Sequence, residues 1–562
     1  MSRNHRSRPL LLTLAAVALA ALIYWSAATE RQGNEQDIRF SSIADITSDT
    51  GERLMWKECD QLPAMPAGTE IGCAWLGFDD EHLGEIWIPI AVFSSGNTGN
   101  TPVIYLPGGP GGSGWLEEFG LAGWQDWWQS VDANRDLIVF DPRGTGLGFP
   151  NPQCEQFREQ RRAHLTAHSG PNREAADFAL ALTRCIKDIH AKGTDLRGFS
   201  TAAMVDDVDR IARLLQQSQG YTRYHLHGIS YGSRLALQIS RHAPDWLESM
   251  VLDGVYPPDR DGLTHLPRFF ALMLDRIDQV CAASAWCNER FGEAGVPILA
   301  LAHELRENPV TRTIRWQDGR RQQIIFSDQR LLEALAADVY TNEALPFLPL
   351  MIARFMDGEE DALDMLLWNL LAFEADSSFN RLIFSAVECQ DNAFLSAAAW
   401  QAMWAAHPQH APFISTYFDE NACARMGLSP ATPAWREPPV SDIPTLLVSA
   451  GLDPVTPVAD AEHTAQYLSR SQHLVIANAP HGATFGHPCA HAAMRAFWAG
   501  ASTPPHCDLD DLPLSASNDA DALDALIRET ADFWGYKPEE TGPSPECRAS
   551  ISKNFDIDAP IP

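Results

Sequence analysis

Short apolar segments alternate with helical ones between residues 70 and 255, and this rhythm restricts the fold more than any other feature. The strand-like segments read IWIPIAVF, TPVIYLPGG, DLIVFDPRG, RYHLHGI and MVLDGVY. A helical pattern over 200–219 lies among them, with four apolar side chains on one face and Ser200 as a suitable N-cap. Strands that alternate with helices form a parallel sheet with helices on its faces, so we predict an α/β fold.

The rhythm is interrupted from about residue 256 to 440, where helical stretches such as FFALMLDRIDQVCAA and DQRLLEALAADVY dominate. One hairpin, TRTIRWQDGRRQQIIFS, turns at Asp318-Gly319 within this part. Strand-like segments return in IPTLLVSAG and QHLVIANA. The predicted divisions are a signal peptide or signal anchor (1–28), a sheet domain in two parts (40–255 and 441–500), an inserted domain (256–440) and a C-terminal tail with one helix (501–562).

The stretch Gly228-Ile229-Ser230-Tyr231-Gly232 places a serine where a strand turns into a helix. Two glycines allow the backbone to reverse sharply at a point where a Cβ atom would clash. This is the context in which G-x-S-x-G presents a nucleophile, so Ser230 is a candidate nucleophile rather than an ordinary turn residue.

Two further candidates follow the returning strands. Asp453 lies in GLDPVTP, directly after the first, and His481 lies in NAPHG, directly after the second. Serine needs an imidazole to take its proton and a carboxylate to orient that imidazole. The chain order Ser230, Asp453, His481 is that of the α/β-hydrolase triad, so we predict these three as catalytic residues.

Other histidines compete with His481. His487 and His491 are alternatives in the next predicted helix, whereas His225 and His227 lie in the strand before Ser230 and suit structural roles. His481, His487, Cys489 and His491 also lie close together in the chain. We expect no metal site there, because Cys489 suits a disulfide in an exported protein.

A glycine-rich loop supplies the remaining part of an acyl-transfer site. Pro107–Gly114, PGGPGGSG, follows an early strand and lacks the G-K-[ST] ending of a phosphate-binding loop. We predict that the backbone N–H groups of Gly109 and Tyr231 bind the oxyanion, with Gly108 as the alternative to Gly109.

These motifs together resemble the prolyl aminopeptidase and tripeptidyl aminopeptidase group of α/β-hydrolases. The resemblance covers roughly residues 70–500 and includes FDPRGTGLG and VLDGVYPP. Pro107 stands where prolyl aminopeptidases usually have histidine, and Tyr231 follows the serine as in the tripeptidyl branch.

The resemblance implies an α/β-hydrolase fold, a doubly wound, mostly parallel sheet with an inserted, mainly helical cap domain. It implies a serine aminopeptidase that acts on short peptides with a free N-terminus and needs no cofactor. In such enzymes cap carboxylates bind the substrate's α-amino group, and AVECQDNAF offers Glu388 and Asp391. The alternatives are an esterase or lipase, because a triad does not choose between ester and amide, and a non-catalytic binding protein.

Charge and cysteine usage indicate where the protein acts. The 562 residues carry a formal net charge of −31, which argues against nucleic-acid binding. Three arginines precede an apolar run from Leu10 to about Trp25, which predicts export to the periplasm or medium, with anchoring by this segment left open. Eleven cysteines follow it. We expect neighbours in sequence to form about five disulfides, with Cys547 left over.

Overall fold

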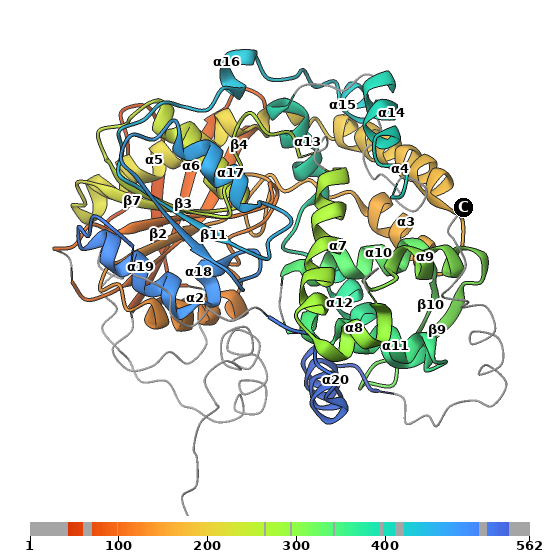
Figure 1. The fold of residues 1–562 in the computed structure, drawn as a ribbon. Helices are drawn as coiled ribbons and strands as arrows, with labels where there is room; N and C mark the ends of the chain where they lie inside the picture. The colour runs from red at the N-terminus through yellow and green to blue at the C-terminus, as the bar shows by residue number, and fades with distance from the viewer. Residues whose placement is uncertain are drawn as a thin grey trace, which may run out of the picture.

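The structure is a computed structural model that describes residues 43–59, 70–97, 99–262, 266–292, 295–340, 343–392, 397–410, 421–504 and 514–538. Two bodies lie side by side in Figure 1, a sheet with helices on both faces and a mainly helical body. The predicted signal segment, 1–28, and the predicted unpaired Cys547 lie outside the described residues.

The sheet has ten strands in the order β1-β2-β3-β4-β6-β5-β7-β8-β11-β12. Pairing is antiparallel from β1 to β4 and between β4 and β6, and parallel from β6 onward to β12. The strands are β1 (Ile46–Thr47), β2 (Arg53–Lys57), β3 (Glu70–Asp80), β4 (Gly84–Ser94), β5 (Val103–Leu106), β6 (Leu137–Phe140), β7 (Tyr224–Ile229), β8 (Leu247–Asp253), β11 (Thr445–Ala450) and β12 (Ser471–Ile476). The predicted α/β architecture with a mostly parallel sheet is confirmed.

Helices cover both faces of this sheet (Figure 1). Helices α5 (Thr201–Gln219), α6 (Tyr231–Arg241) and α17 (Val458–Ala465) contribute to the apolar cluster on one face. Helices α2 (Glu118–Val131) and α19 (Pro488–Trp498), with the short α18 (Ala483–Gly486), contribute to the cluster on the other face. Every residue of β5, β6, β7 and β11 is therefore buried, which explains why these strands read as continuous apolar runs.

The helical body lies between β8 and β11 in the chain and has an apolar core of its own. Its hairpin, β9 (Val310–Arg315) and β10 (Arg321–Phe326), forms where the sequence predicts it. The helices of this insertion are α7 (Leu266–Ala282), α8 (Ala285–Phe291), α9 (Ile298–Glu307), α10 (Asp328–Ala337), η3 (Asp338–Tyr340), η4 (Leu345–Phe347), α11 (Leu348–Met356), η5 (Glu360–Leu363), α12 (Asp364–Ala375), α13 (Arg381–Asp391), α14 (Ala397–Ala405), α15 (Ala422–Arg425) and α16 (Pro433–Arg436).

Two segments outside the insertion also pack on it. Helix α20 (Ala520–Trp534), the predicted tail helix, contributes Leu523 to the core of the helical body. Tyr536 stacks between Trp316 and Trp368, with ring centroids 4.3 and 5.6 Å away. Helices α3 (Glu155–Leu165) and α4 (Pro171–Ala191), with the short η1 (Leu196–Gly198), follow β6, and α3 adds Leu165 to the same core. We call this body the cap.

Four disulfides join cysteines that are neighbours in sequence, as predicted. They are Cys59–Cys73, Cys154–Cys185, Cys281–Cys287 and Cys389–Cys423. Cys489 is also disulfide-bonded, which agrees with the structural role expected for it.

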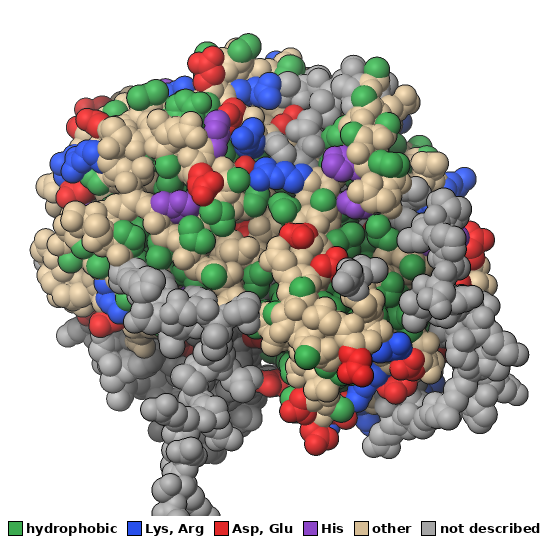
Figure 2. Space-filling model, viewed as in Figure 1, with side chains coloured by type: hydrophobic (Ala, Val, Ile, Leu, Met, Phe, Trp, Pro, Cys, Tyr) green, Lys and Arg blue, Asp and Glu red, His purple; other side chains and the backbone are tan. Residues whose placement is uncertain are grey.

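The surface shown in Figure 2 mixes acidic, basic and apolar side chains over both bodies. Such interspersed charge is typical of a solvated surface. Among the described residues, the helices are either too short or too polar to cross a bilayer.

Candidate active site

Ser230 lies at the turn between β7 and α6 with φ 54° and ψ −120°, a conformation that costs a non-glycine residue about 1–3 kcal/mol. The neighbouring glycines make this turn possible. A Cβ atom at Gly228 would overlap the carbonyl oxygen of Gly232, and one at Gly232 would overlap the carbonyl oxygen of Leu106. The strand–turn–helix context predicted for Ser230 is therefore present, with its backbone in the strained form of a nucleophile elbow.

Asp453 and His481 follow β11 and β12 and form a hydrogen bond, with 2.8 Å between Oδ2 of Asp453 and Nδ1 of His481. The second oxygen of Asp453 accepts the backbone N–H groups of Val455 and Thr456 at 2.7 and 3.1 Å. The Thr456 hydroxyl adds a bond of 2.6 Å to Oδ2. Both carboxylate oxygens thus accept hydrogen bonds from the protein, and these bonds fix the position of the carboxylate relative to the imidazole.

Charge strengthens this pair. Burial alone would raise the pKa of Asp453, but the charge and hydrogen bond of His481 and the donors of Thr456 hold it below its usual range. Burial likewise lowers the pKa of His481, but Asp453 outweighs it and raises that pKa above its usual range. A buried imidazole with a raised pKa is well suited to accept a proton from a neighbouring hydroxyl.

The loop that carries His481 packs against the turn that carries Ser230. A Cβ atom at Gly482 would lie 3.0 Å from Cδ1 of Ile229, the residue before Ser230. The N–H of Ser230 donates to the carbonyl of Asp253 at 2.9 Å, and the next residue, Gly254, lies against His481. Three strand ends therefore bring the predicted serine, aspartate and histidine to the same edge of the sheet.

The predicted oxyanion loop also lies against the serine. A Cβ atom at Gly108 would be 3.4 Å from Cβ of Ser230, so this loop passes at van der Waals distance. Gly109 follows with φ +120°, which only glycine adopts easily. The cap holds the loop, because the Gly111 carbonyl accepts the Asn380 N–H at 2.8 Å.

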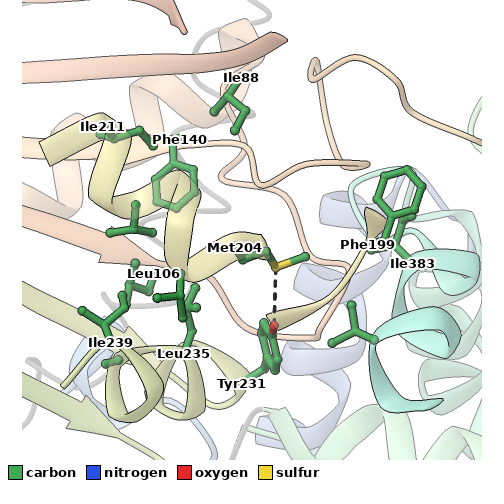
Figure 3. Packing of buried hydrophobic residues seen from close by; sticks show 14 of the residues in the cluster. Ile88, Leu106, Phe140, Phe199, Met204, Ile211, Tyr231, Leu235, Ile239 and Ile383 are labelled. Atoms are coloured by element: carbon green, nitrogen blue, oxygen red, sulfur yellow. Dashed lines mark hydrogen bonds between the residues drawn. The ribbon is translucent and has the colours of Figure 1, made fainter. Parts of the chain in front are cut away.

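Tyr231 is the first residue of α6, and its side chain lies in a buried apolar cluster. Figure 3 shows the phenol directed into the buried cluster, with a hydrogen bond of 3.4 Å to the Met204 sulfur. Its hydroxyl also lies 2.5 Å from Oγ1 of Thr201. Only the backbone N–H of Tyr231 is therefore available to the candidate oxyanion site.

Comparison with known proteins agrees with the fold that carries these residues. Residues 101–283 match the family described as alpha/beta hydrolase fold, and residues 411–509 match the family described as TAP-like protein. The chain has the α/β-hydrolase fold.

Known proteins similar to this α/β-hydrolase include peptidases. It is 25% identical to a tripeptidyl aminopeptidase of Streptomyces lividans over 464 residues, 77% of this chain and 82% of that protein. It is 24% identical to serine protease Hip1 of Mycobacterium bovis over 489 residues, covering 81% and 90% of the two chains. A solved serine hydrolase of Cycloclasticus zankles shares 13% identity over 76% of this chain and 99% of that chain, with a TM-score of 0.34. The two family matches and the two peptidase relatives confirm the predicted resemblance and the prediction of an enzyme of the serine peptidase class.

Glu388 lies on α13 of this α/β-hydrolase and is almost fully buried, with 3% of its surface exposed. It accepts hydrogen bonds from the Tyr256 hydroxyl at 3.3 Å and from the Asn392 side chain at 2.7 Å. Burial raises the pKa of Glu388 to about 7. The charge of Arg234 lowers this pKa, whereas the nearby carboxylates raise it further. The carboxyl is therefore partly protonated near neutral pH when no further cation is present.

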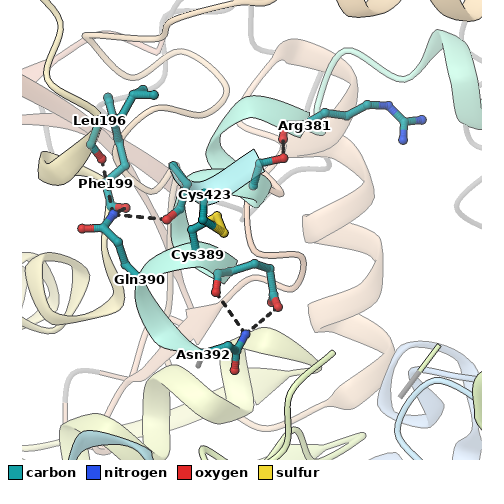
Figure 4. The surroundings of a disulfide bond; sticks show 10 residues. Leu196, Phe199, Arg381, Cys389, Gln390, Asn392 and Cys423 are labelled. Atoms are coloured by element: carbon teal, nitrogen blue, oxygen red, sulfur yellow. Dashed lines mark hydrogen bonds between the residues drawn. A yellow bond between two sulfur atoms is a disulfide. The ribbon is translucent and has the colours of Figure 1, made fainter. Parts of the chain in front are cut away.

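Asp391, one turn further along α13, is buried as well. It accepts the Thr201 hydroxyl at 2.5 Å and lies 3.8 Å from the guanidinium of Arg234. Figure 4 shows how the end of α13 is fixed, with the disulfide at Cys389 and the Gln390 amide bonded to the Phe199 carbonyl at 2.6 Å. The two predicted cap carboxylates thus share one cation next to the first turn of α6.

Asp253 is not among the candidates named from the sequence. It is the last residue of β8, and thus lies at a strand end, as Asp453 does after β11. Its Oδ2 accepts the N–H and hydroxyl of Thr484 at 2.7 and 2.6 Å. Its Oδ1 has no hydrogen-bond partner among the described residues. Burial raises the pKa of Asp253 to about 6, although Thr484 and His481 oppose the shift. The acidic residue in MVLDGVY was the available signal.

The competing histidines have other partners. Nε2 of His491 lies 2.9 Å from the Thr484 carbonyl, and Nδ1 of His487 accepts the N–H of Cys489 at 3.2 Å. Burial lowers the pKa of both His225 and His227 to about 3, which keeps them neutral. Within the described ranges, no cluster of three or more side chains could hold a metal ion.

Proposed function

We propose that this chain is an exported serine aminopeptidase that removes residues or short peptides from the N-terminus of small peptides. Ser230 attacks the scissile carbonyl while His481 takes its proton, and Asp453 holds the imidazole in the required tautomer. His481 then gives the proton to the leaving amine, and water repeats the sequence on the acyl-enzyme.

The observation that carries this proposal is the buried 2.8 Å hydrogen bond between His481 and Asp453 beside the strained turn of Ser230. Energy stored in an unusual backbone conformation is found at functional sites more than elsewhere. The backbone N–H groups of Gly109 and Tyr231 would stabilise the oxyanion, since the loop of Gly109 lies against the serine and Tyr231 begins α6.

Recognition of a free N-terminus is assigned to Glu388 and Asp391. Both carboxyls are buried around the guanidinium of Arg234, so the described part of this neighbourhood carries more potential negative charge than positive charge. The α-ammonium of a peptide would supply the missing cation and stabilise the ionised form of Glu388.

A comparison of free and acetylated peptides tests this function. Dipeptide to tetrapeptide amides with a free amine should show kcat/KM values roughly 10²-fold above those of their N-acetyl counterparts, because acetylation removes the second cation and leaves the two buried carboxyls with only Arg234 to share. Glu388→Gln and Asp391→Asn should reduce that ratio. Asp245→Asn is the matched control, since 84% of the Asp245 side chain is exposed.

Equal cleavage of acetylated and free peptides would refute the aminopeptidase proposal. Turnover of p-nitrophenyl esters alone would favour the esterase alternative. Export has independent support in the disulfides, which form in oxidising compartments.

A further inference from the structure

An aromatic side chain of the cap lies directly on His481. Tyr340, the last residue of η3, packs its ring nearly perpendicular to the imidazole, at 80° and 5.4 Å between centroids. Its surface is 43% exposed although it is a large aromatic residue. Exposed aromatic surface beside a reactive group is where a substrate can gain binding energy.

A second exposed aromatic residue packs beside Tyr340. Phe373 on α12 stacks against it with 6.4 Å between centroids and 19° between planes, and is 41% exposed. The guanidinium of Arg381 lies 5.5 Å from the Phe373 ring and 6.0 Å from that of Phe379. Phe379 forms a backbone bridge with Gly112 of the oxyanion loop. Aromatic rings thus extend from His481 toward the oxyanion loop.

The turn that carries Tyr340 is attached to the loop that carries Asp453. Arg276 donates to the carbonyls of Asp338 and Val339 at 3.3 Å each. The same guanidinium donates to the carbonyl of Leu452, the residue before Asp453, at 3.4 Å. Because one buried cation holds both segments, Tyr340 is positioned relative to His481 before any substrate arrives.

The proposed function indicates which part of a bound peptide would lie on the Tyr340 and Phe373 rings. Glu388 and Asp391, which would hold the N-terminal ammonium, contact Tyr256, Thr201 and Arg234. The ring partners of Tyr340 are instead His481 and Phe373, and His481 is the group that passes a proton to the leaving amine. The N-terminal part of a peptide therefore lies toward α13, and the part released as the amine lies toward Tyr340.

We propose that Tyr340 and Phe373 form the subsite for a large apolar side chain, aromatic or leucine-like, on the residue that follows the scissile bond. The inference rests on the proposed function for its direction along the peptide. A side chain that covers the two rings removes apolar surface from water on both partners, which favours Phe, Tyr, Leu or Met over Gly.

Acyl transfer from the acyl-enzyme to added amines tests the subsite. The amine nitrogen attacks the ester carbon of acylated Ser230, the new C–N bond replaces the C–Oγ bond, and His481 moves the amine proton to Oγ. Phenylalanine amide and glycine amide compete with water for an acyl-enzyme made from a p-nitrophenyl ester. The parent enzyme should use the phenylalanine amide about tenfold more efficiently than the glycine amide.

Variants assign this preference to the rings. Tyr340→Ala and Phe373→Ala should each bring the ratio of the two amines close to one, whereas Tyr340→Phe, which keeps the ring, should retain it. Leu180→Ala is the control, because Leu180 on α4 is 50% exposed and lies outside the site. Titration of active serines with a fluorophosphonate shows that each variant is folded, and damage to His481 alone would slow both amines equally.

Equal use of the two amines by the parent, or an unchanged ratio in both alanine variants, would overturn the proposal. So would a changed preference for the acyl donor with an unchanged preference for the amine. The test needs only an acyl-enzyme, so its outcome is separate from that of the acetylation experiment, which decides the aminopeptidase function itself.

Discussion

At the scale of single residues, the site combines a strained serine with a well-satisfied acid–imidazole pair. Ser230 is held at φ 54° by the fold around it, and Asp453 receives three hydrogen bonds besides that of His481. Strain at one residue persists only where its surroundings are rigid, and the Ser230 turn is held by the hydrogen bond of its N–H to the Asp253 carbonyl and by the close packing of Gly228 and Gly232.

Substitution of Ser230 separates catalysis from strain. Ser230→Ala should lose roughly 10³-fold or more in kcat/KM, because only the oxyanion site and substrate binding remain. Ser230→Gly should lose as much activity but gain about 1 kcal/mol in free energy of unfolding, since glycine adopts a positive φ without strain. Peptide hydrolysis and urea unfolding measure the two effects. Activity within tenfold of the parent would point to another nucleophile.

Asp253 provides a second residue-scale prediction. The pKa of His481 is raised chiefly by Asp453, against the effect of burial, and further by Asp253. Asp253→Asn removes that second charge, so the His481 pKa should fall and the acidic limb of the pH profile of kcat/KM should move to lower pH. Asp245→Asn should leave the limb in place. A limb that stays in place in Asp253→Asn, with activity reduced at all pH values, would mean that Asp253 acts only through the geometry of Thr484.

At the scale of elements, α13 brings ionisable groups into an apolar setting and is held there by covalent and polar links. The disulfide at Cys389 joins it to α15, and Gln390 bonds to the segment before α5. Such links allow Glu388 to remain buried although its charged form is disfavoured.

The stability contribution of Glu388 should depend on pH. Its pKa of about 7 in the folded state lies above the ordinary value of 4.5, so the neutral form contributes stability that is fully present below pH 4.5. That contribution is lost as the pH rises toward 7. Relative to the parent, Glu388→Gln should therefore gain on the order of 2–3 kcal/mol in free energy of unfolding between pH 4.5 and 8. Urea unfolding of both proteins across this range measures the difference, and a constant difference would contradict the raised pKa.

At the scale of the whole molecule, the cap and the sheet body contact each other at the candidate active site. The cap lies between β8 and β11, and its turn at Tyr340 contacts His481. The tail returns to the cap through α20, so the cap core includes residues more than 150 positions apart in the chain. Under the proposed function, the cap would control substrate access and specificity, whereas the candidate triad lies on the sheet.

The redox state of the whole chain tests the proposed export. Mass mapping of the unreduced protein should find the pairs Cys59–Cys73, Cys154–Cys185, Cys281–Cys287 and Cys389–Cys423, with a fifth bridge at Cys489. One of the eleven cysteines should remain as a thiol. Mostly free thiols would indicate a reducing compartment and contradict export.

The sequence alone determined the features that depend on local pattern. Ser230, Asp453 and His481 could be proposed because each follows a strand, and parallel strands bring their carboxyl ends to one edge of the sheet. The hairpin at Asp318-Gly319 and the pairing of neighbouring cysteines follow from short-range signals of the same kind.

Only the tertiary structure decided the features that depend on contacts between distant segments. Tyr340 precedes His481 by 141 positions in the chain but contacts it. Helix α20 packs on the cap although the inserted segment ends before β11, much earlier in the chain. Asp253 was present in a quoted motif, but its contact with Thr484 spans 231 residues. No local pattern encodes such contacts, because burial and packing of the whole chain select which side chains meet.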